Sequence, residues 1–501
     1  MTKLNGWKAG WAVIVVCVAT VCGAHAQIFT TLASFGGGSS GSSPNGVVQG
    51  INGNYYGTTF YDGTYNGEGV AFEMTPTGAL TTLHNFAGYP TEGGNPDALL
   101  LSTDGSFYGA TYGGGTYNNG FCYAGCGTVF KMTPGGVLTT LYNFCAQAGC
   151  PDGARIGGLT QGTDGNFYGS TSVDGANNGG TIFRITRQGQ LATLYSFCAQ
   201  PGCPDGSEPG DLIQGTDGNF YGATFQGGIS NSVCFYTCGT VFKITQAGKL
   251  TTLHRFCADP NCTDGANPGG LIQAKDGNFY GTALYGGSSP NCGISGCGTL
   301  FKITREGKFM TLHNFAGCPT DGSSPTTLLQ ATDGNLYGTT RTGGANCSGG
   351  GEGTLFKITP DGQLTTLYSF CTKSGCADGS LPGGGLLQAT DGKFYGAASQ
   401  GGVLNANCEY GCGTIFSLDV GLGPFIAFVQ PFGRVGQTGG ILGQGFTGTT
   451  SVSLNGIAAV YTVVSDTFIR ATVPSGATTG YVTVTTPSGT LTSNVPFHVI
   501  K

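Results

Sequence analysis

Short runs of apolar and threonine residues, separated by Gly-rich turns, repeat along most of the chain. One run follows an Asp-Gly or Asn-Gly pair and reads Asn-Phe-Tyr-Gly-Thr-Thr in a common form. A second reads Gly-Thr-Val-Phe-Lys-Ile-Thr, and a third reads Leu-Thr-Thr-Leu-Tyr-Ser-Phe. Such mixtures of β-branched, aromatic and polar residues are typical of half-buried antiparallel strands. The pattern therefore predicts an all-β chain.

The runs recur in register seven times. The glycine of the first run's turn stands at positions 53, 105, 165, 218, 277, 334 and 392, which lie 52 to 60 residues apart. A fourth, short apolar run, such as residues 270–273, precedes each of these turns. We name the four predicted strands of a unit a (Leu-Ile-Gln type), b (Asn-Phe-Tyr type), c (Thr-Val-Phe type) and d (Leu-Thr-Thr type). Tight Gly-containing turns join a to b and c to d.

Seven units of four strands predict a seven-bladed β-propeller. The strand order also predicts how the ring closes. A d strand at residues 29–35 precedes every other element, whereas the last unit, residues 386–418, has strands a, b and c but no d. The N-terminal strand can therefore complete the seventh blade, a permutation that an open solenoid has no reason to show.

These three runs resemble the Gloeo/Verruco (GloVer) tandem repeat of secreted bacterial proteins over about residues 29–419. The resemblance is specific, because all seven units carry it. It implies export to the cell surface, and it implies no established activity.

The composition changes after Asp419, where cysteine disappears and Val/Thr alternation takes over. Alone, this pattern predicts a small β-sandwich. Segments 435–446, 452–456, 469–474 and 480–485 resemble an IPT/TIG immunoglobulin-like domain. We therefore expect a propeller over residues 27–420 and an Ig-like β-sandwich over residues 423–501.

The first 26 residues have the pattern of a secretory signal peptide. Lys3 and Lys8 precede an uncharged apolar run over residues 11–21, and Ala24-His25-Ala26 forms a small-x-small cleavage site. The apolar run is shorter than the ~20 residues of a membrane span. The sequence thus predicts a secreted or cell-surface protein with no transmembrane segment.

The glycine content and the low charge exclude further classes of protein. The chain has 95 Gly and 21 Pro among 501 residues, but only 9% of its residues are charged and its net charge is −6. So few charges cannot keep a chain disordered, and so much glycine disfavours helices. Nucleic acid is an unsuitable partner for an acidic chain without clustered cations.

Cysteine spacing predicts disulfides. Apart from Cys17 and Cys22 of the signal segment, sixteen cysteines form eight close pairs: Cys122/Cys126, Cys145/Cys150, Cys198/Cys203, Cys234/Cys238, Cys257/Cys262, Cys292/Cys297, Cys371/Cys376 and Cys408/Cys412. Cys318 and Cys347 remain, and we expect them to pair with each other. A cross-hairpin pairing such as Cys126–Cys145 fails in other units, where Gly179 and Glu352 stand opposite cysteines. Zinc is disfavoured because no histidine accompanies the pairs and the compartment is oxidising.

All these cysteines fall in b–c and d–a loops, which share one face of an up-and-down blade. Variable loops on a rigid scaffold are the usual place for binding. Ligand-binding candidates in the b–c loops are Tyr112, Tyr117, Tyr123, Tyr236, Tyr285 and Tyr410. Aromatic side chains there can stack on a ligand or fill the loop core, and the sequence leaves both open.

No catalytic, metal or cofactor motif stands out. The Asp of each a–b turn suits a backbone cap, and the repeated Asp of the d–a loops is one oxygen donor where calcium needs six to eight. Non-repeated acids are Asp62, Glu68, Asp174, Glu352 and Glu409, which no pattern pairs. We expect a non-catalytic binding or scaffold protein for an extracellular glycan or protein. The alternative is a glycosidase or lyase, which needs two carboxylates at a defined separation.

Overall fold

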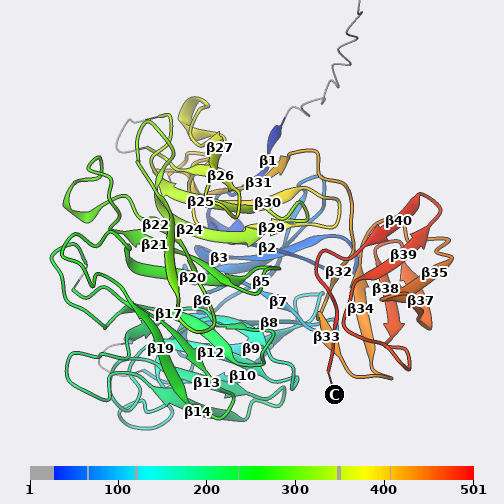
Figure 1. Cartoon of the computed structure of the whole chain (residues 1–501), viewed down its shortest axis with the longest axis horizontal. Coiled ribbons are helices and arrows are strands. Elements are labelled where there is room, and N and C mark those ends of the chain that lie inside the picture. The colour runs from blue at the N-terminus through cyan, green and yellow to red at the C-terminus, as the bar shows by residue number, and fades with distance from the viewer. Residues whose placement is uncertain are drawn as a thin grey trace, which may run out of the picture.

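The computed structural model describes residues 27–64, 67–118, 122–234, 236–346, 351–406 and 408–500. The regular secondary structure of these residues is almost entirely β-strand (Figure 1). Helical elements among them are three-residue 3-10 turns, namely η1 (Gly38–Ser40), η2 (Gly293–Ser295) and η4 (Ser374–Cys376). No helix in this part of the chain has the length and apolar character to cross a membrane.

Residues 28–419 form seven antiparallel sheets that resemble the blades of a propeller, and we number these blades in chain order. Blade 1 contains β2 (Ser42–Gln49), β3 (Tyr55–Tyr61), β4 (Val70–Met74) and β5 (Leu80–Asn85). Blade 2 contains β6 (Gly93–Pro96), β7 (Leu100–Leu101), β8 (Phe107–Gly114), β9 (Thr128–Met132) and β10 (Leu138–Asn143). Blade 3 contains β11 (Ala154–Gln161), β12 (Phe167–Val173), β13 (Thr181–Ile185) and β14 (Leu191–Ser196). Blade 4 contains β15 (Ser207–Pro209), β16 (Ile213–Gln214), β17 (Phe220–Gln226), β18 (Thr240–Ile244) and β19 (Leu250–Arg255).

The remaining blades follow the same order of strands. Blade 5 contains β20 (Ala266–Gln273), β21 (Phe279–Tyr285), β22 (Thr299–Ile303) and β23 (Phe309–Asn314). Blade 6 contains β24 (Ser323–Gln330), β25 (Leu336–Thr342), β26 (Thr354–Ile358) and β27 (Leu364–Ser369). Blade 7 contains β28 (Ser380–Pro382), β29 (Leu387–Gln388), β30 (Phe394–Gln400), β31 (Thr414–Asp419) and the N-terminal β1 (Ile28–Ser34). Because β1 pairs with β31, from Ile28 opposite Asp419 to Ser34 opposite Thr414, the first strand supplies the d strand that the last unit lacks.

Strand a is interrupted in every blade. It is a single bulged strand in blades 1, 3, 5 and 6, where two residues such as Gly157 and Gly158 stand opposite a single residue of strand b. In blades 2, 4 and 7 the same place splits it into two short strands. Bulges bend a strand and re-aim its residues, so these segments project from the inner edge of each sheet.

The repeated aromatic residues join one blade to the next. In six of the seven blades the tyrosine of the Asn-Phe-Tyr run packs on the aromatic residue one position earlier in the run of the following blade, whereas blade 6 carries Leu336 at that position. The stacked pairs are Tyr56/Phe107, Tyr108/Phe167, Tyr168/Phe220, Tyr221/Phe279, Tyr337/Phe394 and Tyr395/Tyr55, with ring centroids 3.9–4.4 Å apart. The last of these pairs connects blade 7 to blade 1. The run is therefore repeated because the interface between blades is repeated.

Backbone hydrogen bonds join the blades in the same circular order. One residue near the start of each a strand donates from its N–H group to the carbonyl that precedes the glycine at the start of strand c in the previous blade. The donors are Ser43, Asn95, Arg155, Glu208, Asn267, Ser324 and Leu381, and the acceptors are Cys412, Glu68, Cys126, Gly179, Cys238, Cys297 and Glu352, at 2.7–3.0 Å. The glycine after each acceptor has no room for a side chain. At Gly239, for example, a Cβ would lie 2.3 Å from the carbonyl oxygen of Thr224 and 2.6 Å from Pro268 Cδ.

Residues after Asp419 form a second β unit with its own core. One sheet contains β32 (Ala427–Phe428), β34 (Thr438–Leu442), β38 (Phe468–Thr472) and β37 (Tyr461–Ser465). The other contains β36 (Ile457–Ala458), β35 (Ser451–Leu454), β39 (Val482–Thr486) and β40 (Gly489–Thr492), and β33 (Phe432–Gly433) pairs with β41 (His498–Val499). Ile441, Ile469, Val452 and Val484 are buried together, so the two sheets share one core. We call this part the C-terminal unit.

Candidate functional site

The two ends of the blades carry different features. The a–b and c–d turns lie at one end, which we call the turn side, and the b–c and d–a loops lie at the other, which we call the loop side. The C-terminal unit binds the turn side (Figure 1). Thr467 Oγ1 donates to the carbonyl of Ile51 at 2.9 Å, and Gln444 Nε2 donates to Thr390 Oγ1 at 3.2 Å. Phe468 packs into an apolar cluster with residues of blades 1 and 2. The loop side has no such cover among the described residues.

The repeated acids of the turn side have structural partners. In blade 3, Asp164 accepts hydrogen bonds from the N–H of Asn166 at 3.1 Å and from the hydroxyl of Tyr168 at 2.9 Å. Other blades repeat this arrangement, and in blade 5 Lys302 Nζ also lies 2.8 Å from the Asp276 carboxylate. These contacts hold the pKa of Asp276 below its usual range. The turn aspartates therefore fix the turn rather than offer a free carboxylate.

The acids of the d–a loops are likewise used within the fold. His254 Nε2 lies 2.9 Å from Asp264 Oδ2, and the same carboxylate accepts the N–H of Cys257 at 3.0 Å. Where strand d carries tyrosine in place of histidine, its hydroxyl takes the same role, as in Tyr195 to Asp205 at 2.8 Å. A histidine or tyrosine of strand d thus pairs with a carboxylate of the loop that follows it, and in blade 1 this pair is His84 with Glu92.

Eight disulfides staple the loop side. They join Cys122–Cys126, Cys145–Cys150, Cys198–Cys203, Cys234–Cys238, Cys257–Cys262, Cys292–Cys297, Cys371–Cys376 and Cys408–Cys412. Each is the local pair that the spacing predicts. Cys318 Sγ lies 3.1 Å from the carbonyl oxygen of Gly344. Its predicted partner Cys347 lies outside the described residues, as do Cys17 and Cys22, so that bridge stays a prediction.

The six candidate tyrosines lie in the b–c loops and adjoining strand ends, but the structure does not gather them into one cluster. Tyr123, Tyr236 and Tyr410 are 79%, 74% and 70% exposed, and they belong to blades 2, 4 and 7. Tyr112 and Tyr117 of blade 2 are about 40% exposed. Tyr285 of blade 5 packs against the core of its blade, so packing is its role. The other five rings are exposed to solvent, and three of them share blade 2.

Tyr112 belongs to a patch that crosses three blades. Its ring lies 6.0 Å from that of Phe60, which in turn contacts Tyr61, both from blade 1. The guanidinium of Arg155, from blade 3, lies 5.3 Å from the centroid of the Tyr112 ring. A cation over an aromatic face is attracted to it, most strongly where water is excluded. We call Phe60, Tyr61, Tyr112 and Arg155 the aromatic patch.

Sequence reasoning missed Phe60, Tyr61 and Arg155. Arg155 is the second residue of β11, and the equivalent residue near the start of strand a has φ of +52° to +59° in all seven blades although none of the seven is glycine. Such backbone is uncommon outside glycine and is kept only where the surroundings demand it. The repeat could have indicated this position as a candidate for binding, because its place in the unit is constant and its side chain changes from blade to blade.

Two further carboxylates lie where strand a is interrupted in blades 2 and 4. Asp211 of blade 4 accepts the N–H of Gly158 of blade 3 at 2.8 Å, and Asp97 of blade 2 accepts the N–H of Ala98 at 2.7 Å. Enclosure by the surrounding blades raises the pKa of both groups, and the charge of Asp211 raises that of Asp97 further. The Asp211 side chain nevertheless reaches solvent. Sequence reasoning missed these two aspartates too. The signal was that the other blades carry Gly, Thr, Asn or Ala at these positions, and none carries an acid.

The non-repeated acids of the loop side come from four blades. Asp62 and Glu68 meet through a backbone bridge in blade 1, whereas Asp174, Glu352 and Glu409 belong to blades 3, 6 and 7. Glu68 is packed under Gly88 and Gly94 of the next loop, and burial raises its pKa. It supports the loop rather than facing a ligand.

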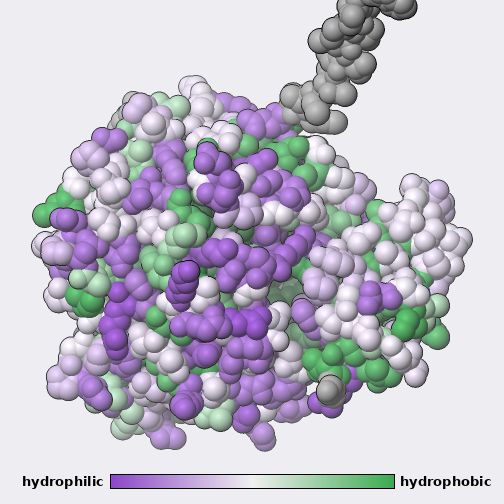
Figure 2. Space-filling view, in the orientation of Figure 1, coloured by the Kyte–Doolittle hydropathy of each residue, from purple (hydrophilic) through white to green (hydrophobic). Residues whose placement is uncertain are grey.

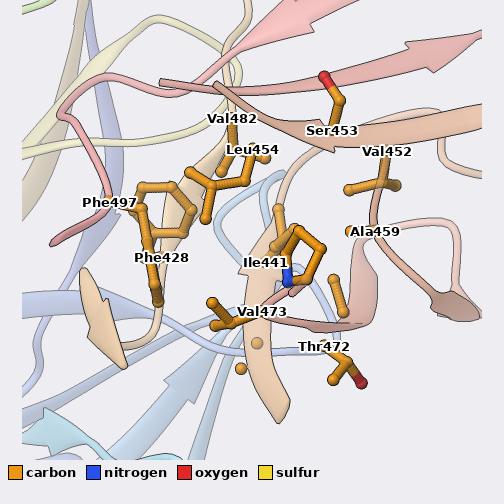
Figure 3. Close-up of a pocket in the computed structure, with 14 residues that line it drawn as sticks. Phe428, Ile441, Val452, Ser453, Leu454, Ala459, Thr472, Val473, Val482 and Phe497 are labelled. Carbon is orange, nitrogen blue, oxygen red and sulfur yellow. The ribbon is translucent and has the colours of Figure 1, made fainter. Parts of the chain in front are cut away.

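The C-terminal unit has a small cavity between its sheets (Figure 3). Its volume is about 40 Å³, and its lining includes Phe428, Ile441, Leu454, Val473 and Phe497. A cavity of about 150 Å³ is needed to hold benzene, so this space is a packing gap. On the surface in view, Figure 2 shows hydrophobic residues concentrated over this unit and hydrophilic ones over the blades. Its exposed apolar residues include Val435, Val460 and Val464.

Comparisons with known proteins bear on the fold. The family model described as the Gloeobacter/Verrucomicrobia repeat matches residues 20–234, 122–349 and 290–445. A sequence search of curated proteins finds no match. A fungal alcohol oxidase of the AA5 family, solved in complex with copper, is similar in structure with a TM-score of 0.51 and 12% identity, over 95% of this chain and 100% of that one. This likeness shows a shared fold alone.

Two further solved structures are more distant. PorZ, a surface component of the type-IX secretion system of Porphyromonas gingivalis, gives a TM-score of 0.45 and 13% identity over 90% of this chain and 58% of that one. A PQQ-bound aldose sugar dehydrogenase from Streptomyces coelicolor gives 0.38 and 14% over 78% of this chain and 98% of that one.

Proposed function

The chain belongs to the Gloeobacter/Verrucomicrobia repeat family, and from this premise we propose that it is an exported, non-catalytic binding protein. Residues 1–26 would be its signal peptide, 27–420 a closed seven-bladed propeller, and 423–501 an IPT/TIG-type Ig-like domain. Closure is supported by the hydrogen bond from the N–H of Ser43 to the carbonyl of Cys412 and by the Tyr395/Tyr55 stack, since both connect blade 7 to blade 1. Eight disulfides support an oxidising compartment.

The observation that carries the binding role is the contrast between the two sides. The C-terminal unit contacts the turn side, whereas the loop side presents exposed tyrosines on loops held by disulfides. The aromatic patch is its best-formed part, because Tyr112 and Arg155 come from different blades and hold each other in place. A flat ring beside a guanidinium suits a glycan ring or a polar protein surface. We propose an extracellular glycan or protein as the ligand.

The test is a screen of the mature chain, residues 27–501, against glycan and protein arrays, followed by affinity measurement on the strongest hit. Tyr112→Ala and Arg155→Ala should each weaken binding at least tenfold, because an aromatic or Arg anchor at the centre of an interface carries about 1.4 kcal/mol or more. Tyr481→Ala is the matched control, since Tyr481 is 44% exposed but lies on the C-terminal unit. Equal affinity of all three variants would place the ligand elsewhere.

A second candidate function is supported by Asp97 and Asp211. Glycoside hydrolysis uses one carboxyl that keeps its proton and one that loses it, and Asp97 has the raised pKa that the first role needs. This alternative is a glycosidase or lyase acting at these two aspartates. Polysaccharide cleavage that Asp97→Asn and Asp211→Asn each abolish, while ligand binding persists, would favour the enzyme. Cleavage unaffected by both would exclude these residues.

A further inference from the structure

Two disulfides of blade 4 lie directly against each other. Cys234 and Cys238 belong to the b–c loop, and Cys257 and Cys262 belong to the d–a loop. The Sγ atoms of Cys234 and Cys257, which are not bonded to each other, are 3.4 Å apart. All four sulfur atoms lie within 4.8 Å of one another. The two loops thus bring four potential thiolates to one point.

We propose that these four cysteines form a metal site when both bridges are reduced, with Zn²⁺ as the preferred ion. Tetrahedral zinc bound by four thiolates has Zn–S distances of about 2.3 Å, which places the sulfurs about 3.8 Å apart. The unbonded sulfurs are already near that spacing, and only the bonded pairs need to separate. Soft thiolate ligands select zinc over calcium or magnesium.

The surroundings suit a closed metal site. Cys238, Cys257 and Cys262 are at most 2% exposed and lie in an apolar cluster with Val241 and Phe256. An apolar shell excludes water from the metal and strengthens its bonds to thiolates. Cys234 is only half-buried, so it provides the route by which a reductant and the metal reach the others.

The b–c and d–a loops approach each other closely in another blade as well, so the contact between the two bridges follows from the shape of the blade. In blade 5 the b–c bridge faces glycine instead: a Cβ on Gly317 of the d–a loop would lie 2.8 Å from Cys292 Sγ. Only blades 2 and 4 carry close cysteine pairs in both loops. In blade 2, Cys122, Cys126 and Cys145 lie within the same 4.8 Å, so a second, similar site can form there.

Conversion of the two disulfides into a metal site needs a reductant and releases protons. A small dithiol or phosphine gives two electrons to each bridge and is oxidised, and each bridge takes up two protons to become two thiols. The four thiols then lose four protons as the metal binds. The blade 4 loops accordingly have two stable states, two disulfides or one bound metal, and oxidation releases the metal.

The experiment measures zinc bound per chain after phosphine reduction without oxygen, removal of the reductant and gel filtration. Cys257→Ser/Cys262→Ser should bind one zinc fewer than the wild type. Cys198→Ser/Cys203→Ser is the matched control, because blade 3 has Gly179 opposite this pair, and it should bind as much as the wild type. The difference does not depend on a blade 2 site. Equal zinc in all three proteins overturns the proposal.

Two readouts connect the zinc to a folded site. Cobalt in place of zinc should give the intense visible bands of tetrahedral thiolate coordination, and the blade 4 variant should lose part of this signal. Zinc should also protect the four cysteines of blade 4 from alkylation, as peptide mass spectrometry would show. If reduction abolishes the near-UV circular dichroism of the tyrosines and zinc does not restore it, the site is not part of the fold and the proposal fails.

Discussion

The turn side and the loop side of the blades are formed by the same strands, but they differ in how far their side-chain contacts recur from blade to blade. At the turn side the contacts are nearly identical from blade to blade: an Asp cap, a tyrosine hydroxyl such as that of Tyr168, and a stacked ring of the next blade. At the loop side the backbone and the bond between strand d and the loop carboxylate recur, whereas most other side chains change. This difference indicates that the contacts between blades are concentrated in repeated residues of the turn side, so the side chains of the loop side can vary.

The strongest test of this contrast replaces one tyrosine on each side. Tyr168 is fully buried and stacked on Phe220 at 4.0 Å, so Tyr168→Ala should lower the free energy of unfolding by about 3–5 kcal/mol. Tyr236, on the loop side, is 74% exposed, so Tyr236→Ala should change it by about 0.5 kcal/mol or less. Denaturant unfolding followed by circular dichroism measures both. Similar losses for the two variants would remove the contrast.

The second prediction concerns the cover of the turn side. Phe468 of the C-terminal unit is 6% exposed and packs with Tyr56 and Phe107. Phe468→Ala should cost about 3 kcal/mol and expose the a–b turns of blades 1 and 2 to hydrogen exchange. Phe446→Ala is the control, because Phe446 is buried inside the C-terminal unit alone. If both variants expose the turns equally, the contact through Phe468 does not hold the two parts together.

The repeat predicts the strands and the local disulfide pairs because both depend on contacts close in sequence. The position of the C-terminal unit could not be predicted, because Phe468 has the same apolar character as the residues inside its own sandwich. Asp97 and Asp211 show the same limit. Their absence from the other blades is visible in the sequence, but only the folded arrangement of the split a strands of blades 2 and 4 brings the two carboxylates near each other.

The third prediction compares the closing contact of the ring with an internal one. Gln49 accepts the N–H of Thr390 at 3.1 Å and donates to its hydroxyl at 3.0 Å, joining blades 1 and 7. Gln273 makes the same pair of bonds to Thr216, joining blades 5 and 4. Gln49→Ala and Gln273→Ala should each lower the free energy of unfolding by about 1–2 kcal/mol. A neutral Gln49→Ala beside a costly Gln273→Ala would indicate an open ring.

The smallest expected effect lies between the two sides, at Asp97. Enclosure and the charge of Asp211 raise its pKa in the folded chain. Between the ordinary carboxyl pKa of about 3.9 and this raised value, the folded chain keeps a proton that the unfolded chain has lost. Its free energy of unfolding therefore falls as pH rises through this range, and Asp97→Asn should remove that decline.

Urea unfolding of the wild type and of Asp97→Asn from about pH 4 to about pH 8 measures the effect, and the two curves should separate as the pH rises. Asp211→Asn provides the finer test, because it removes the repelling charge and leaves Asp97 in place. It should shift the wild-type decline to lower pH without abolishing it. Parallel curves for all three proteins would mean that water around these carboxylates screens their charge, and the enzyme alternative would lose the proton donor on which it depends.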